Sequence, residues 1–383
     1  MDLFFILVHL CSWAQLGTLT RIYLGQLFGA APCQQPGPWT WVPCVTSDGL
    51  SRYGGALFSD VVSNVLGSFI MGLATTSDIL AMIYSHRPDS IVKGVPVAIL
   101  PRGSPLQKYT AIQLGIRTGS CGSLTTFASW MTQVVKMMVG GEPSSIGTDW
   151  VSALCALFVG TSVSLVALSM GQHLALLIHA WLNRTGAQAQ PQPLSPYCGA
   201  ADGAAPPDQA VVELVVTGPP EPPPACMRWQ RLCVDVWTTL QLLTLTGVSL
   251  AYAYLDTRDP QAQVATTRAY FWFSILFGPA GCLLRWWLSF LNVRFKEGVL
   301  SWFPLGTFLA NQLACVIDFN IALLLVRLTG LSLTQEAVMK GLITGMNGCL
   351  STVSTWVVEV GGVRGGEGGG GGEAGGRGRH CCC

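Results

Sequence analysis

The sequence predicts an all-α polytopic membrane protein: two inverted four-helix repeats joined by one linking transmembrane helix, with the last helix of the second repeat missing. A low charge content, eight long apolar stretches and an internal repeat lead to this prediction. Only 11% of the 383 residues are charged and 50% are hydrophobic, whereas soluble domains carry about 25% charged residues. This composition predicts the lipid bilayer as a partner. The net charge of +1 argues against nucleic acid as another.

Eight stretches are long and apolar enough to span a bilayer, which takes about 20 residues. They are residues 3–29, 57–83, 107–139, 150–182, 232–255, 269–292, 302–328 and 336–360. The third and the eighth stretches contain glycines in mid-span, so we expect both helices to be broken there.

The spans and the composition between them divide the chain into five parts. These are the first repeat with four spans (1–182), a Pro- and Ala-rich linker (183–231), the linking helix (232–255), the second, inverted repeat with three spans (256–360) and a disordered glycine-rich tail (361–383). The tail resembles a truncated or mistranslated end.

Lys and Arg residues orient the chain in the membrane. The loop after the second span shares its side with the N-terminus and the linker, and it contains Arg87, Lys93, Arg102 and Lys108. The opposite side has fewer basic residues. Because basic loops stay inside, we expect the N-terminus and the linker to be cytoplasmic.

Three motifs recur in the same order in both halves. The first is a segment that runs from glycine to arginine, Gly17–Arg21 in the first span and Gly281–Arg285 in the sixth. The segment Asn64-Val65-Leu66-Gly67-Ser68 of the second span corresponds to the segment around Asn311 in the seventh. The third and eighth spans share the pattern G-x-x-G-x-L-[TS]-T-x-x-x-W, at residues 119–130 and 345–356. Five spans precede the second copy, so it enters the membrane from the opposite face. Inverted repeats of this kind place ion sites near the bilayer midplane.

The repeated glycines and hydroxyls cannot sustain a regular helix facing lipid, because freed carbonyls must find a partner. Two such breaks meeting at a pseudo-two-fold axis can hold a small hard cation with oxygens alone. The alternative is that the glycines only allow close helix packing. The residues leave both interpretations open.

The repeated asparagines Asn64 and Asn311 offer neutral N–H donors inside the membrane. Such donors can replace the water around an anion without trapping it, or they can hold two helices together. The edges of the Phe127 and Trp130 rings are electropositive and can also face an anion, although ordinary packing is common for aromatics. Arg21 and Arg285 either attract anions to a vestibule or have a structural role, which we favour.

The sequence does not predict an enzyme, because it has no nucleophile elbow, metal triad or phosphate loop. A proton-coupled carrier needs a central carboxylate, and Asp318 is the one serious candidate. Cys33 and Cys44 share an outer loop and can form a disulfide, but nothing in the sequence requires it.

Together these motifs resemble the Fluc/FEX fluoride channels, the CrcB-like family, in its fused eukaryotic branch. The most specific segments are residues 117–130 and 348–356. The resemblance implies a fluoride-selective channel of the plasma membrane that exports fluoride from the cytoplasm by passive permeation and protects against fluoride toxicity. It also implies a monomer, since the fused chain is a pseudo-dimer.

The resemblance assigns roles to particular residues. It implies a pore that binds the fluoride ion through Asn64, Thr126, Phe127, Ser129, Trp130, Asn311, Thr352, Ser354, Thr355 and Trp356. It implies a structural sodium ion held by the carbonyls of Gly122, Thr125, Gly348 and Ser351. Arg21 and Arg285 match the first-span arginine of the family, with a vestibule or structural role.

Two departures from the family pattern bear on function. Val353 stands where the family has an aromatic ring, so we expect one conducting pathway rather than two, without knowing which. The second half lacks a fourth span. Two alternatives therefore stay open: a proton-coupled small-ion secondary transporter, and a non-conducting truncated membrane scaffold.

Overall fold

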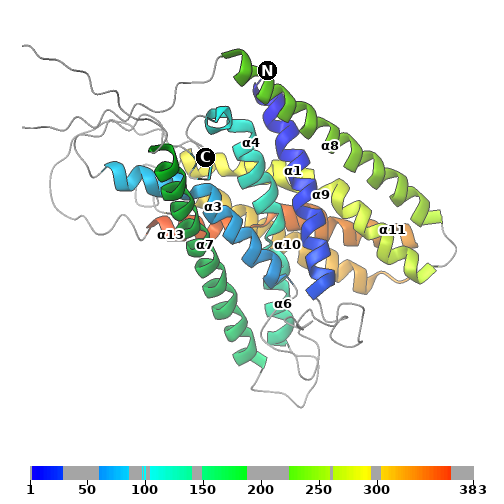
Figure 1. Cartoon of the computed structure of the whole chain (residues 1–383). Coiled ribbons are helices and arrows are strands. Elements are labelled where there is room, and N and C mark those ends of the chain that lie inside the picture. Colours follow the sequence, from blue (N-terminus) through cyan, green and yellow to red (C-terminus); the bar gives the residue numbers. More distant parts are fainter. Residues whose placement is uncertain are drawn as a thin grey trace, which may run out of the picture.

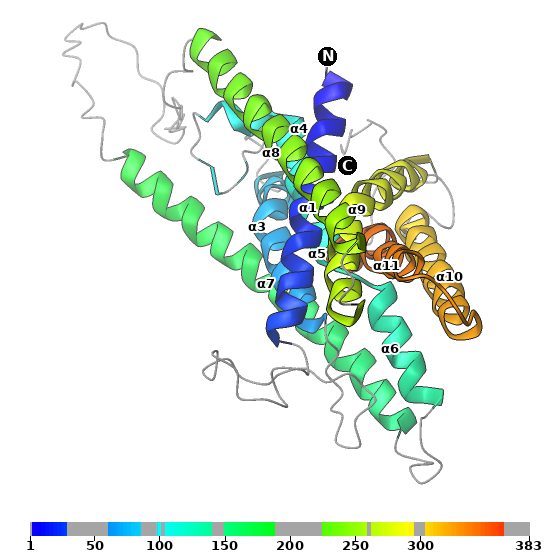
Figure 2. The same ribbon diagram turned by 90° about the vertical axis from the view of Figure 1, so that its right-hand side faces the viewer.

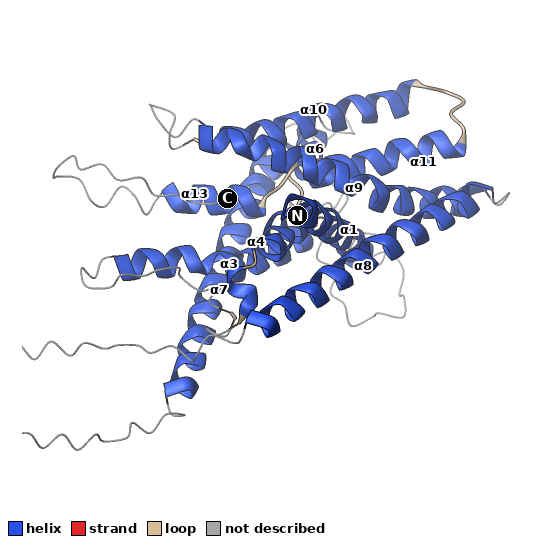
Figure 3. Ribbon diagram, turned by 90° about the horizontal axis from the view of Figure 1, so that it is seen from above, coloured by secondary structure: helices blue, strands red, loops and turns tan. Residues whose placement is uncertain are grey.

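The computed structural model describes residues 2–28, 60–85, 97, 99–100, 104–139, 149–187, 224–258, 262–294 and 303–363. Every regular element in these ranges is a helix, which confirms the predicted all-α class (Figure 1, Figure 3). Five of the described helices are long and apolar enough to cross a membrane: Leu3–Phe28, Trp150–Leu182, Arg228–Arg258, Arg268–Asn292 and Leu305–Arg327. The predicted Cys33–Cys44 pair, residues 188–223 of the linker and the tail from residue 364 lie outside the described residues.

The first, second and fourth predicted spans correspond to the helices α1 (Asp2–Phe28), α3 (Val61–Ser85) and α7 (Asp149–Ala187). α3 packs along α7 through glycines. A Cβ atom added to Gly72 would overlap the carbonyl oxygen of Leu168, and one added to Gly171 would overlap that of Phe69. Glycine is needed at these two positions because the helix backbones touch there.

The third span is broken, as the glycines in mid-span predict. It consists of a 3₁₀ turn (Pro105–Lys108), α4 (Thr110–Leu114), a π-helical segment (Gly115–Cys121), α5 (Gly122–Leu124) and α6 (Ala128–Val139). Thr125 is extended, with φ −92° and ψ 147°, and it ends α5. The π-helical segment before the break was not predicted.

The eighth span repeats this order. It consists of α11 (Leu333–Gly341), a π-helical segment (Leu342–Asn347), α12 (Gly348–Leu350) and α13 (Ser354–Val363). Ser351 is extended, with φ −83° and ψ 151°, and therefore has nearly the same backbone conformation as Thr125. The breaks of the two halves meet, since α5 and α12 contact each other.

The remaining helices are α8 (Pro224–Arg258), α9 (Ala262–Arg294) and α10 (Leu305–Arg327). α8 contains the predicted linking span, residues 232–255, and extends beyond it at both ends. α8 lies along α1 and α9, at the outside of the bundle (Figure 2). It begins at the end of the molecule where α1 also begins (Figure 1).

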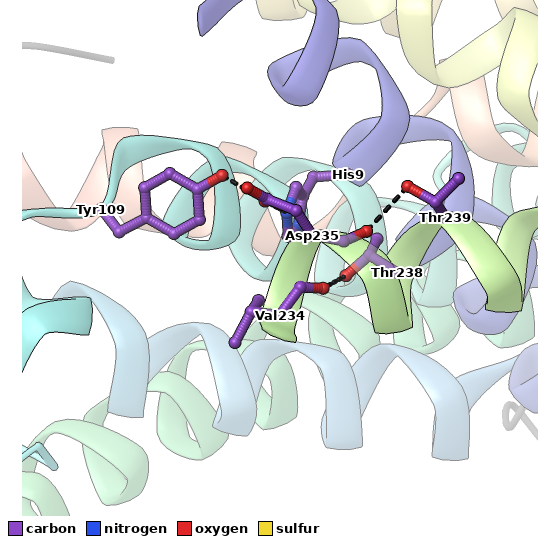
Figure 4. Close-up of polar contacts among 6 residues, drawn as sticks. All are labelled: His9, Tyr109, Val234, Asp235, Thr238 and Thr239. Carbon is purple, nitrogen blue, oxygen red and sulfur yellow. Dashed lines mark hydrogen bonds and ion pairs between the residues drawn. The ribbon is translucent and has the colours of Figure 1, made fainter. Parts of the chain in front are cut away.

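A buried polar cluster attaches α8 to the first half (Figure 4). The Oδ1 atom of Asp235 lies 3.0 Å from Nε2 of His9 on α1, and it accepts a hydrogen bond from the Tyr109 hydroxyl at the start of the broken span. Arg231 stacks over the Tyr109 ring, with Cζ 5.4 Å from the ring centroid. One carboxylate on the linking helix thus joins two elements of the first half.

Candidate ion pathway at the crossing of the broken helices

Asn64 on α3 spans the break of its own half. Its side-chain oxygen accepts a hydrogen bond from the backbone N–H of Thr126 at 2.8 Å, and its amide nitrogen donates to the carbonyl of Thr126 at 3.1 Å. The side chain is buried. Since an amide nitrogen carries two hydrogens, this contact uses one of them and leaves the other for a second acceptor.

Asn311 on α10 makes the same pair of contacts in the second half. Its side-chain oxygen accepts from the backbone N–H of Thr352 at 2.7 Å, and its amide nitrogen donates to the Thr352 carbonyl at 3.1 Å. The structure therefore places both predicted asparagines at the breaks, each with one amide hydrogen beyond this contact.

Hydroxyl groups connect the two breaks to each other. Thr125 Oγ1 accepts hydrogen bonds from the backbone N–H groups of Val353 and Ser354, both at 3.2 Å. These groups open helix α13 of the other half, which has no earlier turn to bond them. The Thr125 hydroxyl also lies 3.2 Å from that of Thr352.

Ser351 makes the reciprocal contacts. Its Oγ atom accepts from the backbone N–H groups of Phe127 and Ala128, at 3.2 and 3.1 Å, at the start of α6. It also lies 3.2 Å from Oγ1 of Thr126. The hydroxyl on each extended residue thus caps the helix that follows the break in the other half, which fixes the crossing of the two segments.

The remaining predicted hydroxyls lie beside this crossing. Thr126 and Ser129 are paired with Oγ atoms 3.5 Å apart, and Thr352 and Thr355 are paired at 3.4 Å. Ser354 donates to the carbonyl of Cys121 at 3.2 Å. The predicted hydroxyls therefore form one cluster shared by the two halves.

Both predicted arginines are buried and reach across to the broken helix of the other half. Arg285 Nη1 donates to the carbonyl of Gly122 at 2.6 Å and to that of Ser351 at 3.4 Å, and Nη2 donates to that of Thr118. Arg21 Nη2 donates to the carbonyl of Thr344. In this arrangement the guanidinium groups serve as hydrogen-bond donors to freed carbonyls, the role expected of a structural arginine.

The arginine contacts bear on the predicted sodium ion. Two of the four carbonyls expected to hold it, those of Gly122 and Ser351, already accept hydrogen bonds from the Arg285 guanidinium. The Arg21 guanidinium lies against Gly348, the third residue of the set. A cationic group therefore stands where the cation was expected, and these residues do not fit a sodium ion in this structure.

The aromatic residues are brought together across the two halves. The ring centroids of Phe127 and Trp130 lie 5.7 Å apart, with an interplanar angle of 81°. The Phe127 and Trp356 rings lie 6.0 Å apart, with an angle of 60°. Both pairs are edge-on, so ring edges are available to a neighbouring group. Val353 is fully buried in the same apolar cluster as Trp130.

Two further carboxylates bond to neighbouring helices, and the sequence singled out only Asp318, as the candidate for proton coupling. Glu359 Oε1 on α13 accepts hydrogen bonds from Thr307 Oγ1 at 2.8 Å and from Asn292 Nδ2 at 3.0 Å. Asp318 on α10 accepts from Asn347 Nδ2 at 2.7 Å. The signal that would have found both clusters is a polar residue on each of several apolar spans, but contacts between spans are not readable from one sequence.

Comparisons with known proteins agree with this geometry. The model of the CrcB-like protein family (Camphor Resistance, CrcB) matches residues 8–172 and 272–368, which is more than half of the chain. Fluoride export protein 1 of Neurospora crassa is 25% identical over 387 residues, which cover 93% of this chain and 61% of the relative. No solved structure matches the chain.

Shorter matches involve a fungal and a bacterial relative. Fluoride export protein 1 of Candida albicans is 41% identical over 99 residues, or 24% of each chain. Fluoride-specific ion channel FluC 1 of Staphylococcus epidermidis is 41% identical over 83 residues, or 22% of this chain and 61% of the relative. The chain thus spans about three fifths or less of the length of these relatives. The match of the family model to both halves shows that this multi-pass membrane protein belongs to the CrcB-like family.

Proposed function

We propose that the chain is a fluoride-selective channel that exports fluoride from the cytoplasm by passive permeation and protects the cell against fluoride toxicity. The observation that carries this proposal is the position of Asn64: its amide bonds to the backbone of Thr126 at the crossing of the broken helices. Relatives named as fluoride export proteins and a fluoride-specific ion channel support it.

The chemistry of the crossing suits a small, strongly hydrated anion. Neutral amide and hydroxyl hydrogens can replace the water around fluoride, and ring edges add positive potential without a full charge. The arginines donate to carbonyls rather than facing an open pathway. An anion that meets only neutral donors is stabilised but not trapped, which passive permeation requires.

The conducting pathway that we propose runs past Phe127 and Trp356. These two rings face each other across the halves, and both pack against the apolar cluster formed by α3, α6, α7 and α13. α13 contacts both α3 and α7, which enclose it. The other pathway would pass Trp130 and Val353, and Val353 offers no ring edge.

We further propose that the two halves are inverted repeats in the plasma membrane, with a cytoplasmic N-terminus, and that the fused pseudo-dimer works as a monomer. Two reciprocal pairs of contacts between the halves support an inverted pair: those of the two capping hydroxyls and those of the two arginines. α1 and α8 begin at the same end of the molecule, which supports an even number of crossings from the start of α1 to the start of α8 (Figure 1).

The experiment that tests the function is anion efflux from liposomes containing the purified chain, measured with fluoride and with chloride electrodes. Fluoride efflux with little chloride efflux is the expected result. Equal efflux of both ions would contradict the selectivity. Absence of any efflux from folded protein would favour the non-conducting scaffold.

One observation favours a second candidate, a proton-coupled small-ion transporter: Asp318 is buried beside the crossing and bonded to Asn347. The Asp318→Asn variant separates the two functions. A carrier would lose coupling between fluoride and proton movement in this variant, whereas a channel would retain its fluoride flux. We expect retained flux, and no fluoride-driven proton uptake in the unsubstituted chain.

A further inference from the structure

The positive charge at the crossing has an unexpected source. Arg285 on α9 donates hydrogen bonds to three carbonyls around the two breaks, those of Gly122, Ser351 and Thr118. Both arginines are at least nine-tenths buried. The sequence led us to expect a metal ion at these carbonyls, but a side chain of the same sign of charge occupies the position.

Two repeated glycines form seats for the guanidinium groups. A Cβ atom added to Gly122 would overlap the Arg285 guanidinium, with Cζ only 2.6 Å away. A Cβ atom added to Gly348 would overlap the Arg21 guanidinium, with Cζ 2.5 Å away. The same contact therefore occurs twice, once in each direction between the halves. It explains the second glycine of the repeated G-x-x-G pattern without invoking a metal ligand.

Electrostatics disfavours an additional cation at the same carbonyls. A sodium ion bound to the Gly122 or Ser351 oxygen would lie a few ångströms from the Arg285 guanidinium. Like charges that close repel strongly in a buried, weakly polar environment. A guanidinium with several fixed donors already satisfies the carbonyls that the helix break frees.

The two arginines differ in their surroundings. Asp60 and Asp318 both interact electrostatically with Arg21. The hydrogen bonds of Arg285 within the described residues go to carbonyl oxygens and to the Cys282 sulfur. Within the described residues Arg285 therefore donates to three carbonyls and Arg21 to one, that of Thr344.

We propose that Arg285 and Arg21 are positioning residues that hold the two broken helices together in place of a metal ion, with Gly122 and Gly348 as their seats. The crossing then needs no sodium for its stability. This inference rests on the proposed function only where fluoride flux is measured, because the stability of the crossing is a property of the fold.

The first test is the melting temperature of the purified full chain, measured in sodium chloride, potassium chloride and N-methyl-D-glucamine chloride. We expect the same melting temperature in all three salts and no shift on titration with sodium. A melting temperature that rises with sodium but not with potassium would overturn the proposal, since it would show a selective cation site.

Gly122 could be needed either for its contact with the Arg285 guanidinium or for a carbonyl that binds sodium. The Gly122→Ala variant distinguishes these two roles. Alanine keeps the backbone carbonyl that a sodium ion would use, but its methyl group displaces the guanidinium. We expect a fall in melting temperature of about 3 °C or more, in sodium and in potassium alike. The matched control is Gly247→Ala on the linking helix, where an added Cβ meets nothing within 4 Å. A Gly122→Ala protein as stable as this control would show that the contact between Gly122 and the Arg285 guanidinium does not stabilise the crossing.

Arg285→Gln removes the charge but keeps an N–H donor, and Arg285→Lys keeps the charge but loses the planar fork. Both variants should melt at a lower temperature, with Arg285→Gln more affected than Arg21→Gln. If Arg285→Gln does not fold, the sodium titration and the comparison of Gly122→Ala with Gly247→Ala still test whether the arginines replace a metal ion.

Fluoride efflux in sodium-free buffer should equal fluoride efflux in sodium buffer. Absence of efflux in both buffers would contradict the proposed function. The melting temperatures would still test whether the two arginines stabilise the crossing without sodium.

Discussion

At the scale of single residues, the side-chain amide of Asn64 combines a structural role with the proposed role in binding an anion. Asn64 satisfies the N–H and the carbonyl of Thr126, both freed by the helix break, and it retains one amide hydrogen, which in the proposed channel would bind the anion. The sequence indicated a functional asparagine because Asn64 and Asn311 recur at the same place in both halves. It could not show that each amide bonds to the break of its own half, because that contact joins residues 62 positions apart.

The Asn64→Leu variant removes both roles. A hydrogen bond to a charged group is worth about 1.5–3 kcal/mol, so we expect fluoride efflux to fall roughly 10- to 100-fold. The measurement is the initial efflux rate per reconstituted protein, with the amount of folded protein checked by size-exclusion chromatography.

Asn64→Asp is the companion variant, because a carboxylate still accepts from Thr126 N–H but repels an anion. Its efflux should also be low. Efflux from Asn64→Leu equal to that of the unsubstituted chain would place the pathway elsewhere in the molecule.

The aromatic residues supply a matched pair of substitutions. Phe127→Ala removes a ring edge from the pathway past Trp356, whereas Val353→Ala trims an aliphatic side chain on the other pathway. Aromatic edge contacts are worth about 0.5–1.5 kcal/mol, so Phe127→Ala should lower fluoride efflux roughly 2- to 10-fold. Val353→Ala should leave it nearly unchanged, when both are measured in the same liposome assay. The reverse ranking would assign conduction to the Val353 pathway.

At the scale of helices, the sequence predicted where the third and eighth spans break but not how. Glycines and hydroxyls in mid-span exclude a continuous lipid-facing helix, and the extended residues Thr125 and Ser351 are those breaks. The π-helical segments before them were not predicted, because a wider turn depends on packing against other helices rather than on local composition.

The linking helix depends on a carboxylate that no motif identified. Asp235 accepts from Tyr109 and contacts His9, and both partners belong to the first half (Figure 4). Asp235→Leu removes the hydrogen bonds that Asp235 makes with the Tyr109 hydroxyl and with the buried His9 ring, at a cost of about 1–3 kcal/mol each. We expect a clearly lower melting temperature, measured on the purified protein by tryptophan fluorescence.

Two further variants control for this effect. Asp235→Asn keeps an oxygen for the Tyr109 hydroxyl and should be less destabilising than Asp235→Leu. Thr257→Ala on the same helix removes only an exposed hydroxyl, and it should leave the melting temperature nearly unchanged. If Asp235→Leu melted like Thr257→Ala, the cluster would have no part in attaching α8.

At the scale of the whole molecule, most of the predicted architecture came from the internal repeat in the sequence. The repeat in the sequence led us to expect that the broken segments meet, and α5 and α12 do contact each other. The hydrogen bonds from each half to the broken segment of the other half were not predictable from the sequence. Arg285 and Ser351 of the second half each bond to the broken segment of the first half. The sequence of one half does not show which residues of the other half it contacts.

The proposed inverted topology has a direct test in the intact molecule. Single cysteines can be placed in a functional variant from which reactive cysteines have been removed, one before the linking helix and one after it. Position 200 lies in the linker and position 259 between α8 and α9. Because one span separates them, a membrane-impermeant maleimide should label position 259 from outside intact cells and position 200 only after permeabilisation. Labelling of both from the same side would mean that α8 does not cross, and the second half would then point the same way as the first.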